Sequence, residues 1–263
     1  VGKTHLAKKL SELLFGSEES MIRVDMSEFQ EKHSVSRLIG SPPGYVGYNE
    51  GGQFTEKVRQ RPYSLILFDE IEKGHPDIFN ILLQILDDGY VTDAAGRKIN
   101  FRNTLIMMTS NIGVKKSQDF NRSLGFATKS SEQTDKERIR TIISKSLKNT
   151  FNPEFLNRLD DVIMFETLDK SSVKKIVKIE LSSLTSRLME KNYSIKFSPS
   201  IIDHICEVGY DEKFGARPLK RAIQSEVEDY ISSEILKDSI KEGIQYNLSY
   251  SKKSNEFKIV DKG

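Results

Sequence analysis

The sequence has few of the features that mark secreted, membrane-bound or strongly charged proteins. Of its 263 residues only Cys206 is a cysteine, which excludes an internal disulfide framework and fits a reducing compartment. No apolar run approaches the roughly 20 residues that cross a bilayer. Forty basic against 38 acidic residues give a net charge of +2, so electrostatics do not favour nucleic acid or an anionic membrane as the main partner. These absences predict a soluble intracellular protein.

Two further absences narrow the chemistry. The four histidines, at positions 5, 33, 75 and 204, are scattered and have no metal-ligand spacing. No Ser/His/Asp or Cys/His arrangement is visible. Any proteolysis connected with this chain would therefore have to come from a partner protein.

The first two thirds of the chain alternate between strand and helix patterns. The run 64–68 (SLILF) is continuously apolar, as in a strand buried on both faces of a parallel sheet. Alternation of this kind predicts an α/β fold with a parallel sheet. We expect helices over 4–15 and from Pro76 onward, and strands at 21–27, 64–68, 103–111 and 161–165.

After Leu168 the pattern becomes mostly helical. Residues 218–237 place apolar side chains four apart along one face. We expect a domain boundary near 166–170, with an α/β domain at 1–167 and a small, mostly α-helical domain at 168–263. Within the second we expect helices at 169–190, 199–208 and 218–237, and short strands at 193–197, 244–250 and 257–260.

The chain opens on Gly2-Lys3-Thr4 at a predicted helix start. Phosphate binding uses backbone N–H groups, a lysine that reaches the terminal phosphates and a hydroxyl that ligates Mg²⁺. Lys3 and Thr4 would supply the lysine and the hydroxyl. The alternative is an ordinary N-terminal helix, because a GK[ST] triplet occurs by chance in roughly one chain in ten.

Asp69 and Glu70 follow the buried run, at the carboxyl end of a predicted parallel strand, where ligands of open α/β sheets bind. In a nucleotide hydrolase the aspartate holds Mg²⁺ and the glutamate polarises the attacking water. The alternative is a strand that ends in two solvated acids. Together with Gly2-Lys3-Thr4, some 65 residues upstream, the pair favours a nucleotide site.

Three more residues are candidates for the same site. Asn111 ends the next buried strand and would orient a water or contact a phosphate, although asparagine is also common in turns. Arg158 would stabilise developing phosphate charge, or would only form a salt bridge to Asp160 or Asp161. Arg217 lies at the start of a predicted helix of the second domain, where it would sense the nucleotide or simply be a surface cation.

In their order and spacing, several segments resemble the AAA+ ATPases of the Clp/Hsp100 group, and in particular their second ATPase module. The resemblance covers essentially the whole chain. It implies a nucleotide-binding α/β subdomain followed by a small helical lid, assembled as a homo-hexameric ring around a pore, in the cytoplasm or an organelle stroma. The segments are GKT, LILFDEIEKGHP, TSN, NPEFLNRLD, GARPL and EKHSVSRLIGSPPGYVGYNEGG.

The resemblance also implies roles and cofactors. It implies ATP and Mg²⁺, bound and turned over by the residues that match Gly2, Lys3, Thr4, Asp69 and Glu70. Asn111 and Arg217 match the two sensors of the family, and Arg158 matches the finger that reaches the ATP of a neighbouring subunit. The family has four more phosphate-loop residues and a central strand before the position of Val1. We therefore expect residues 1–263 to be a C-terminal fragment that neither hydrolyses ATP nor folds robustly alone.

A loop rich in proline and glycine, SPPGYVGYNEGG, begins at Ser41. The resemblance assigns its GYVG segment, with Tyr45 and Val46, to gripping a polymer in the pore; the alternative is a loop packed on its own domain. From Ser41 to Glu56 there is no Lys or Arg, which favours a polypeptide over nucleic acid as that polymer. Residues 92–102 resemble a second pore loop.

A polar loop predicted at 112–134 contains one apolar island, Leu124-Gly125-Phe126. Such long loops are usually functional or disordered. In the family this tripeptide docks peptidase-coupled members into ClpP-type peptidase rings, so we favour an ATP-driven unfoldase that feeds a peptidase. A disaggregase without a peptidase and a nucleotide-binding scaffold without activity remain alternatives, and the island could also pack on its own surface.

Overall fold

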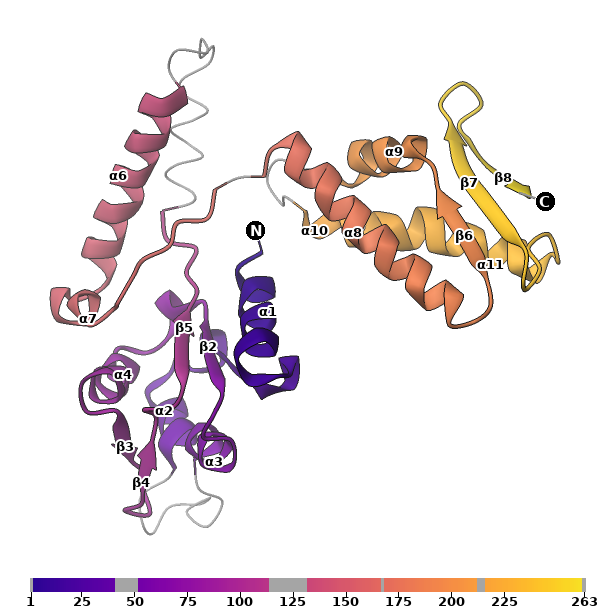
Figure 1. Ribbon diagram of the computed structural model, residues 1–263. Helices are drawn as coiled ribbons and strands as arrows, with labels where there is room; N and C mark the ends of the chain where they lie inside the picture. The colour runs from indigo at the N-terminus through magenta and orange to yellow at the C-terminus, as the bar shows by residue number, and fades with distance from the viewer. Residues whose placement is uncertain (1, 41–51, 114–131, 167, 212–215, 262–263) are drawn as a thin grey trace. The chain divides into compact units, whose positions relative to one another are not determined.

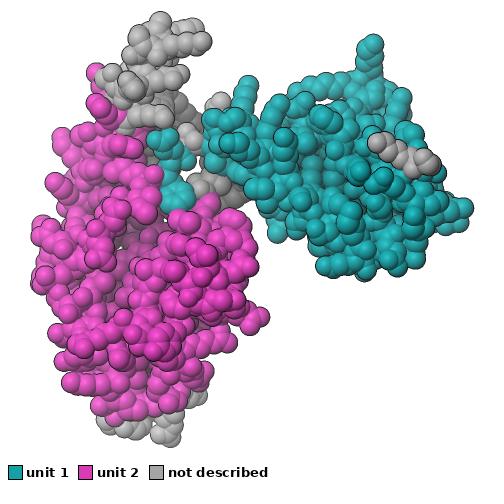
Figure 2. All heavy atoms as spheres, in the orientation of Figure 1, with its two compact units in different colours: residues 1, 165–263 teal, residues 2–164 magenta. Residues whose placement is uncertain are grey.

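The computed structural model describes residues 2–40, 52–113, 132–166, 168–211 and 216–261, without the side chains of 132–136 and 217. These residues form two compact units, 2–164 and 165–263, which Figure 2 distinguishes by colour. None of the helices in the described ranges has the length and apolar content needed to cross a membrane.

The first unit is built on a parallel sheet with strand order β1-β2-β5 (Figure 1). Its helices are α1 (Lys3–Phe15), α2 (Lys32–Ile39), α3 (Gln53–Gln60), α4 (Pro76–Asp88), α6 (Glu132–Thr150) and α7 (Pro153–Asn157), with 3-10 turns η1 (Glu18–Ser20), η2 (Met26–Glu28) and η4 (Ile71–Lys73). Its strands are β1 (Met21–Asp25), β2 (Leu65–Asp69), β5 (Leu105–Met108) and an antiparallel pair, β3 (Tyr90–Thr92) and β4 (Lys98–Asn100).

Strand β2 is covered on both faces, as its continuous apolar run predicts. Ile66 and Phe68 pack into the main core with residues of α2, α3 and α4. Leu65 and Leu67 point to the opposite face and pack with Ala7 of α1. Because β2 also pairs with a strand on each side, its carboxyl end is the best-anchored part of the sheet.

The second unit packs helices on a small sheet of order β6-β7-β8 (Figure 1). Its core joins one stripe of each helix to the inward residues of the sheet, including Ile195 and Leu248. A six-residue π-helical segment, η5 (Ile223–Glu228), continues α10 into α11. The elements are α8 (Lys170–Met189), β6 (Ser194–Phe197), α9 (Pro199–Gly209), α10 (Arg217–Ala222), α11 (Asp229–Leu236), β7 (Gln245–Ser251) and β8 (Glu256–Asp261).

One predicted strand, 161–165, is wrong. No strand forms there, and Val162, Ile163 and Phe165 are exposed. A strand needs a neighbour that completes its ladder of backbone hydrogen bonds, and among the described residues none pairs with this segment. An apolar pattern of the right length is therefore not sufficient.

Two segments predicted as loops contain regular structure. Residues 92–102 overlap the β3–β4 hairpin, whose turn is fixed by Asp93: its carboxylate accepts hydrogen bonds from the backbone of Ala95 and Arg97. The predicted loop at 112–134 runs into α6, which begins at Glu132. Tyr45, Val46, Leu124, Gly125 and Phe126 lie outside the described residues.

Candidate functional site

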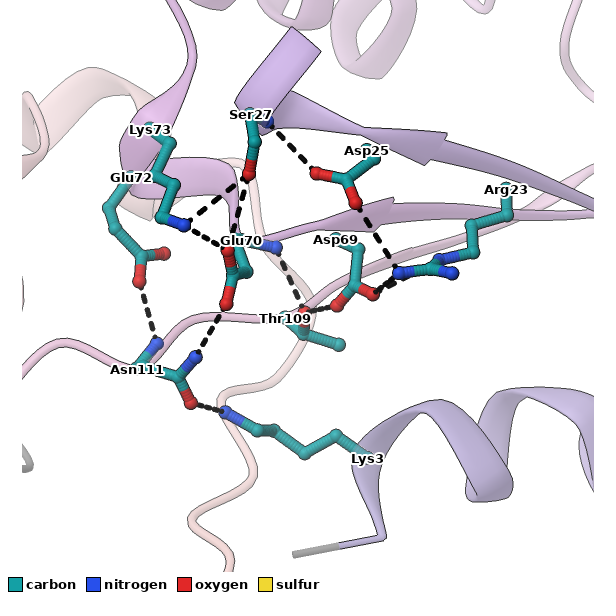
Figure 3. Close-up of polar contacts among 10 residues, drawn as sticks. All are labelled: Lys3, Arg23, Asp25, Ser27, Asp69, Glu70, Glu72, Lys73, Thr109 and Asn111. Atoms are coloured by element: carbon teal, nitrogen blue, oxygen red, sulfur yellow. Dashed lines mark hydrogen bonds and ion pairs between the residues drawn. The ribbon is translucent and has the colours of Figure 1, made fainter.

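The candidate site lies where β2 and β5 end and where α1 begins. Phe68 pairs with Met108 across the parallel ladder, so the residues that follow them leave the sheet at the same level. Those residues are Asp69 and Glu70 on one strand and Thr109 to Asn111 on the other. Figure 3 shows their side chains joined in one polar network with Lys3 from α1.

Lys3 connects the start of α1 to the end of β5. Its ammonium group donates to the Asn111 side-chain oxygen at 2.7 Å and to the carbonyl oxygen of Ser110. The preceding Gly2 has a left-handed backbone with φ of 91°, which glycine adopts without steric cost. Thr4 is half-buried in the first turn of α1, and this turn contains no acidic residue. A helix start of this kind attracts phosphate.

The Asp69 carboxylate is nearly buried, with 12% of its side chain exposed, and both oxygens have partners. Its Oδ2 accepts from Arg23 of β1, at 2.6 Å from Nη2 and 3.1 Å from Nε. Its Oδ1 accepts from the Thr109 hydroxyl. Thr109 in turn accepts the Glu70 backbone N–H at 3.1 Å. One threonine therefore fixes the backbone and the side chain at the end of β2.

The oxygen donors here fit Mg²⁺, which prefers hard oxygen ligands. Asp69 offers a carboxylate at a rigid strand end, and Thr4 offers a hydroxyl beside Lys3. In the described part of the chain no group of three or more His, Cys, Asp or Glu side chains could hold a metal ion. This agrees with Mg²⁺ sites in which one or two protein groups assist substrate phosphates and water.

Glu70 has an unusual backbone and a crowded carboxylate. Its φ of 55° is left-handed, which non-glycine residues seldom adopt outside turns and functional sites. Its Oε2 lies 2.5 Å from the Lys73 ammonium and 3.3 Å from the Ser27 hydroxyl, which donates to it. Its Oε1 accepts from the Asn111 side-chain nitrogen at 3.2 Å. The hydrogen bond from Lys73 is the main reason why the pKa of Glu70 is lowered.

Asn111 links the two halves of the network. Its side-chain oxygen accepts from Lys3 and its side-chain nitrogen donates to Glu70, while its backbone N–H donates to Glu72 at 2.9 Å. The asparagine amide has both a donor and an acceptor, so it can join a cation to a carboxylate. The sequence-predicted residues Lys3, Asp69, Glu70 and Asn111 therefore come together.

The two predicted arginines lie elsewhere. Arg158, just after α7, pairs with Asp87 of α4 instead of Asp160 or Asp161, and 46% of its side chain is exposed. Arg217 is the first residue of α10, in the second unit, and its side chain is not described.

Sequence reasoning missed four members of the network: Arg23, Ser27, Lys73 and Thr109. Lys73 had a detectable signal, because it follows Glu70 by three residues in a turn. Thr109 directly follows a predicted strand next to Ser110 and Asn111. Arg23 is a charged residue inside a predicted strand, and its partner depends on the strand register, which the sequence does not specify.

Comparison with known families agrees with this geometry. Residues 1–162 match the model of the AAA domain (Cdc48 subfamily), and residues 168–248 match the C-terminal, D2-small domain of ClpB protein. The first match alone covers more than half of the chain. The chain therefore belongs to the AAA family, and its second unit contains a D2-small domain.

Individual relatives narrow the family to a group. The protein named ATP-dependent Clp protease ATP-binding subunit ClpC from Staphylococcus aureus (strain USA300) is 54% identical over 261 residues, which cover 99% of this chain and 32% of the relative. The ClpC of Staphylococcus saprophyticus is 53% identical over 262 residues, 100% of this chain and again 32% of the relative. The chain is a ClpC-like ATPase module of the Clp/Hsp100 group, as its motifs predict, and it spans about a third of the length of these relatives.

Proposed function

We propose that this chain binds ATP at the start of α1 and hydrolyses it at the ends of β2 and β5. The observation that carries the proposal is the position of Asn111, which contacts the phosphate-binding candidate Lys3 at 2.7 Å and the candidate base Glu70 at 3.2 Å. One amide thereby connects a group suited to a terminal phosphate with a group suited to the attacking water.

Each residue has a defined part in the proposed reaction. Lys3 and the first backbone N–H groups of α1 bind the terminal phosphates. Glu70 orients a water molecule and accepts its proton, and its lowered pKa keeps the carboxylate ionised at neutral pH. Asn111 holds the water or the terminal phosphate in line.

Asp69 and Thr4 would hold Mg²⁺, which neutralises charge on the phosphates when it is bound. Arg23 and Thr109 keep the Asp69 carboxylate in one orientation. Phosphoryl transfer depends mainly on positioning and on charge stabilisation, and these residues provide both.

We further propose that hydrolysis drives the unfolding and translocation of polypeptides through a homo-hexameric ring. Arg158 would reach the ATP of a neighbouring subunit, and Arg217 would sense nucleotide from the second unit. Tyr45 and Val46 would grip the polypeptide. The support is the similarity to the Clp/Hsp100 group and the absence of basic residues in the loop sequence around Tyr45.

We also propose that the ring delivers polypeptides to a ClpP-type peptidase through Leu124, Gly125 and Phe126. The support is the tripeptide itself and the name of the S. aureus relative, a Clp protease ATP-binding subunit. A disaggregase would have no use for such a docking segment.

The hydrolytic site is tested in the intact protein with Lys3→Ala and Glu70→Gln. The part of hydrolysis that Lys3→Ala abolishes is assigned to this site and is called Lys3-dependent hydrolysis. We expect Glu70→Gln to bind nucleotide normally but to lower this rate at least about 100-fold, the scale of a lost general base. Lys9→Met, which removes a lysine paired with Glu12 and Glu18 on the surface of α1, is the control. Full Lys3-dependent activity in Glu70→Gln would contradict the proposal.

The peptidase proposal has its own experiment. The intact protein is mixed with ATP, an unfolded model substrate and a ClpP-type peptidase, and is compared with a variant in which Leu124, Gly125 and Phe126 are replaced by serine. We expect degradation to need ATP and to disappear in the variant while ATP hydrolysis continues. If neither protein supports degradation although both hydrolyse ATP, the disaggregase alternative replaces this proposal.

A further inference from the structure

Lys73 lies beside the candidate base because of the local backbone. Glu70 is the residue before the 3-10 turn η4 (Ile71–Lys73), and the Lys73 backbone N–H closes the turn on the Glu70 carbonyl oxygen at 2.9 Å. In a 3-10 turn, residues three apart lie above each other. The left-handed φ of Glu70 starts this turn directly at the end of β2, so the chain returns over the carboxylate it has just placed.

The contact fixes one oxygen of the carboxylate and leaves the other to Asn111. Lys73 Nζ lies 2.5 Å from Glu70 Oε2 and 3.4 Å from the Ser27 hydroxyl, which itself donates to Oε2 (Figure 3). Lys73 and Ser27 belong to η4 and η2, two turns that follow different strands. The orientation of Oε2 is therefore set by two elements at once.

Fold stability does not explain this ion pair. The side chains of Lys73 and Glu70 are 46% and 31% exposed, and ion pairs exposed to this degree contribute little to stability. A glutamate has three rotatable side-chain bonds, so a carboxylate at a strand end without partners samples many orientations. What the pair does provide is a single orientation for the group that must face the attacking water.

We propose that Lys73 is a positioning residue for the hydrolytic reaction, which holds the Glu70 carboxylate by Oε2 so that Oε1 stays beside Asn111. The inference rests on the proposed function of Glu70. Lys73 acts through Glu70 and has no part in nucleotide binding, so its loss lowers the rate of hydrolysis without weakening nucleotide binding.

The test compares Lys73→Met, Lys73→Arg and Lys174→Met in the intact protein. Lys174 is a matched control: it is 53% exposed and pairs with Asp203 at 2.7 Å in the second unit. For each variant we measure kcat of Lys3-dependent ATP hydrolysis, the Kd of a fluorescent ATP analogue and the midpoint of thermal unfolding. Glu70→Gln is measured beside them.

We expect Lys73→Met to lower kcat by about tenfold to 100-fold, the range for a misplaced catalytic group, with the Kd changed less than about twofold. Lys73→Arg keeps a cation and should restore kcat to within about threefold of the unchanged protein. Lys174→Met should equal the unchanged protein, and all variants should unfold at similar temperatures.

Full kcat in Lys73→Met, or a loss that Lys73→Arg does not repair, would overturn the inference. A Kd that rises in parallel with the loss of kcat would also overturn it, because it would place Lys73 in nucleotide binding. These outcomes leave the proposed function intact if Glu70→Gln still loses hydrolysis. Only an active Glu70→Gln would contradict the proposed function itself.

Discussion

Arg23 of β1 holds the carboxylate of Asp69 at the end of β2, with Nη2 at 2.6 Å and Nε at 3.1 Å from the same oxygen. In the parallel ladder Arg23 pairs with Leu67, two residues before Asp69. The two side chains therefore share a face of the sheet and meet along a diagonal, within reach of a long side chain. Half of the Arg23 side chain is exposed, whereas the carboxylate is nearly buried.

We expect Arg23→Gln to loosen the end of the sheet, because it removes the charged partner of a nearly buried carboxylate. Such a loss costs about 1–3 kcal/mol, and the exposure of Arg23 places it near 1. Amide exchange of the β1 and β2 peptides in the intact protein should then accelerate about fivefold. Arg59→Gln is the control, since Arg59 is 52% exposed and pairs only locally, with Glu56. Equal exchange in both variants would show that the Arg23 pair does not anchor β2.

The role of Arg158 can be separated from that of its partner Asp87. Arg158→Ala should lower Lys3-dependent hydrolysis by about 10³, the scale of an arginine that stabilises the transition state. Asp87→Asn should change hydrolysis less than about threefold and stability by less than about 1 kcal/mol, because the Arg158 and Asp87 side chains are 46% and 37% exposed. If Asp87→Asn loses as much activity as Arg158→Ala, the ion pair itself is what hydrolysis requires.

Gly52 is held against the end of α2 and cannot accept a side chain. A Cβ there would lie 2.3 Å from the Leu38 carbonyl oxygen and 2.6 Å from the Gly40 nitrogen, both of which are backbone atoms. Gly52→Ala should therefore shift α3 against α2 and destabilise the first unit by about 1–3 kcal/mol, the usual cost of overpacking. Thermal unfolding of the intact protein, followed by the exchange of α2 and α3 amides, measures this.

Gly96→Ala is the comparison for that variant. Gly96 has a φ of 78°, but a Cβ added there would have no neighbouring atom within 4 Å, so only backbone strain of about 1 kcal/mol applies. A Gly52→Ala protein no less stable than Gly96→Ala would contradict the close approach of α3 to α2.

Asp169 begins α8 and makes the second unit sensitive to acid. Hydrogen bonds from the hydroxyl and backbone N–H of Ser172, and from Ser171, lower the pKa of Asp169 from 3.8 to about 2. A depressed pKa in the folded state means that the cap contributes stability above about pH 4 and loses it as the pH falls toward 2. Asp169→Ala should thus lower the unfolding midpoint at pH 7, and this difference should narrow between pH 4 and pH 2. A difference that is constant over that range would exclude the cap as its origin.

The strands that carry the site could be predicted from sequence because their apolar runs are continuous and end in polar residues. The buried runs before Asp69 and before Thr109 correspond to β2 and β5, and Lys3 does lie at the start of a helix. Local patterns are reliable where both faces of an element are covered, since burial then requires every residue to be apolar.

Other elements depend on context that local patterns do not contain. Helices α2 and α3 have eight residues each and flank a segment rich in proline and glycine. Helix α6 is 19 residues long, but most of them are polar. Residues 161–165 have a strand pattern without a pairing neighbour. Lys73 and Arg23 reach the site through a tight turn and a strand register, and both follow from three-dimensional placement.

The polar network at the strand ends nearly neutralises itself. Figure 3 contains three cations, Lys3, Arg23 and Lys73, and four carboxylates, Asp25, Asp69, Glu70 and Glu72, which sum to 3 − 4 = −1. A ligand that binds there exchanges one set of ionic partners for another, and it does not meet a bare charge. Affinity is then a small difference between two well-satisfied arrangements, so modest changes in any one partner can tune it in either direction.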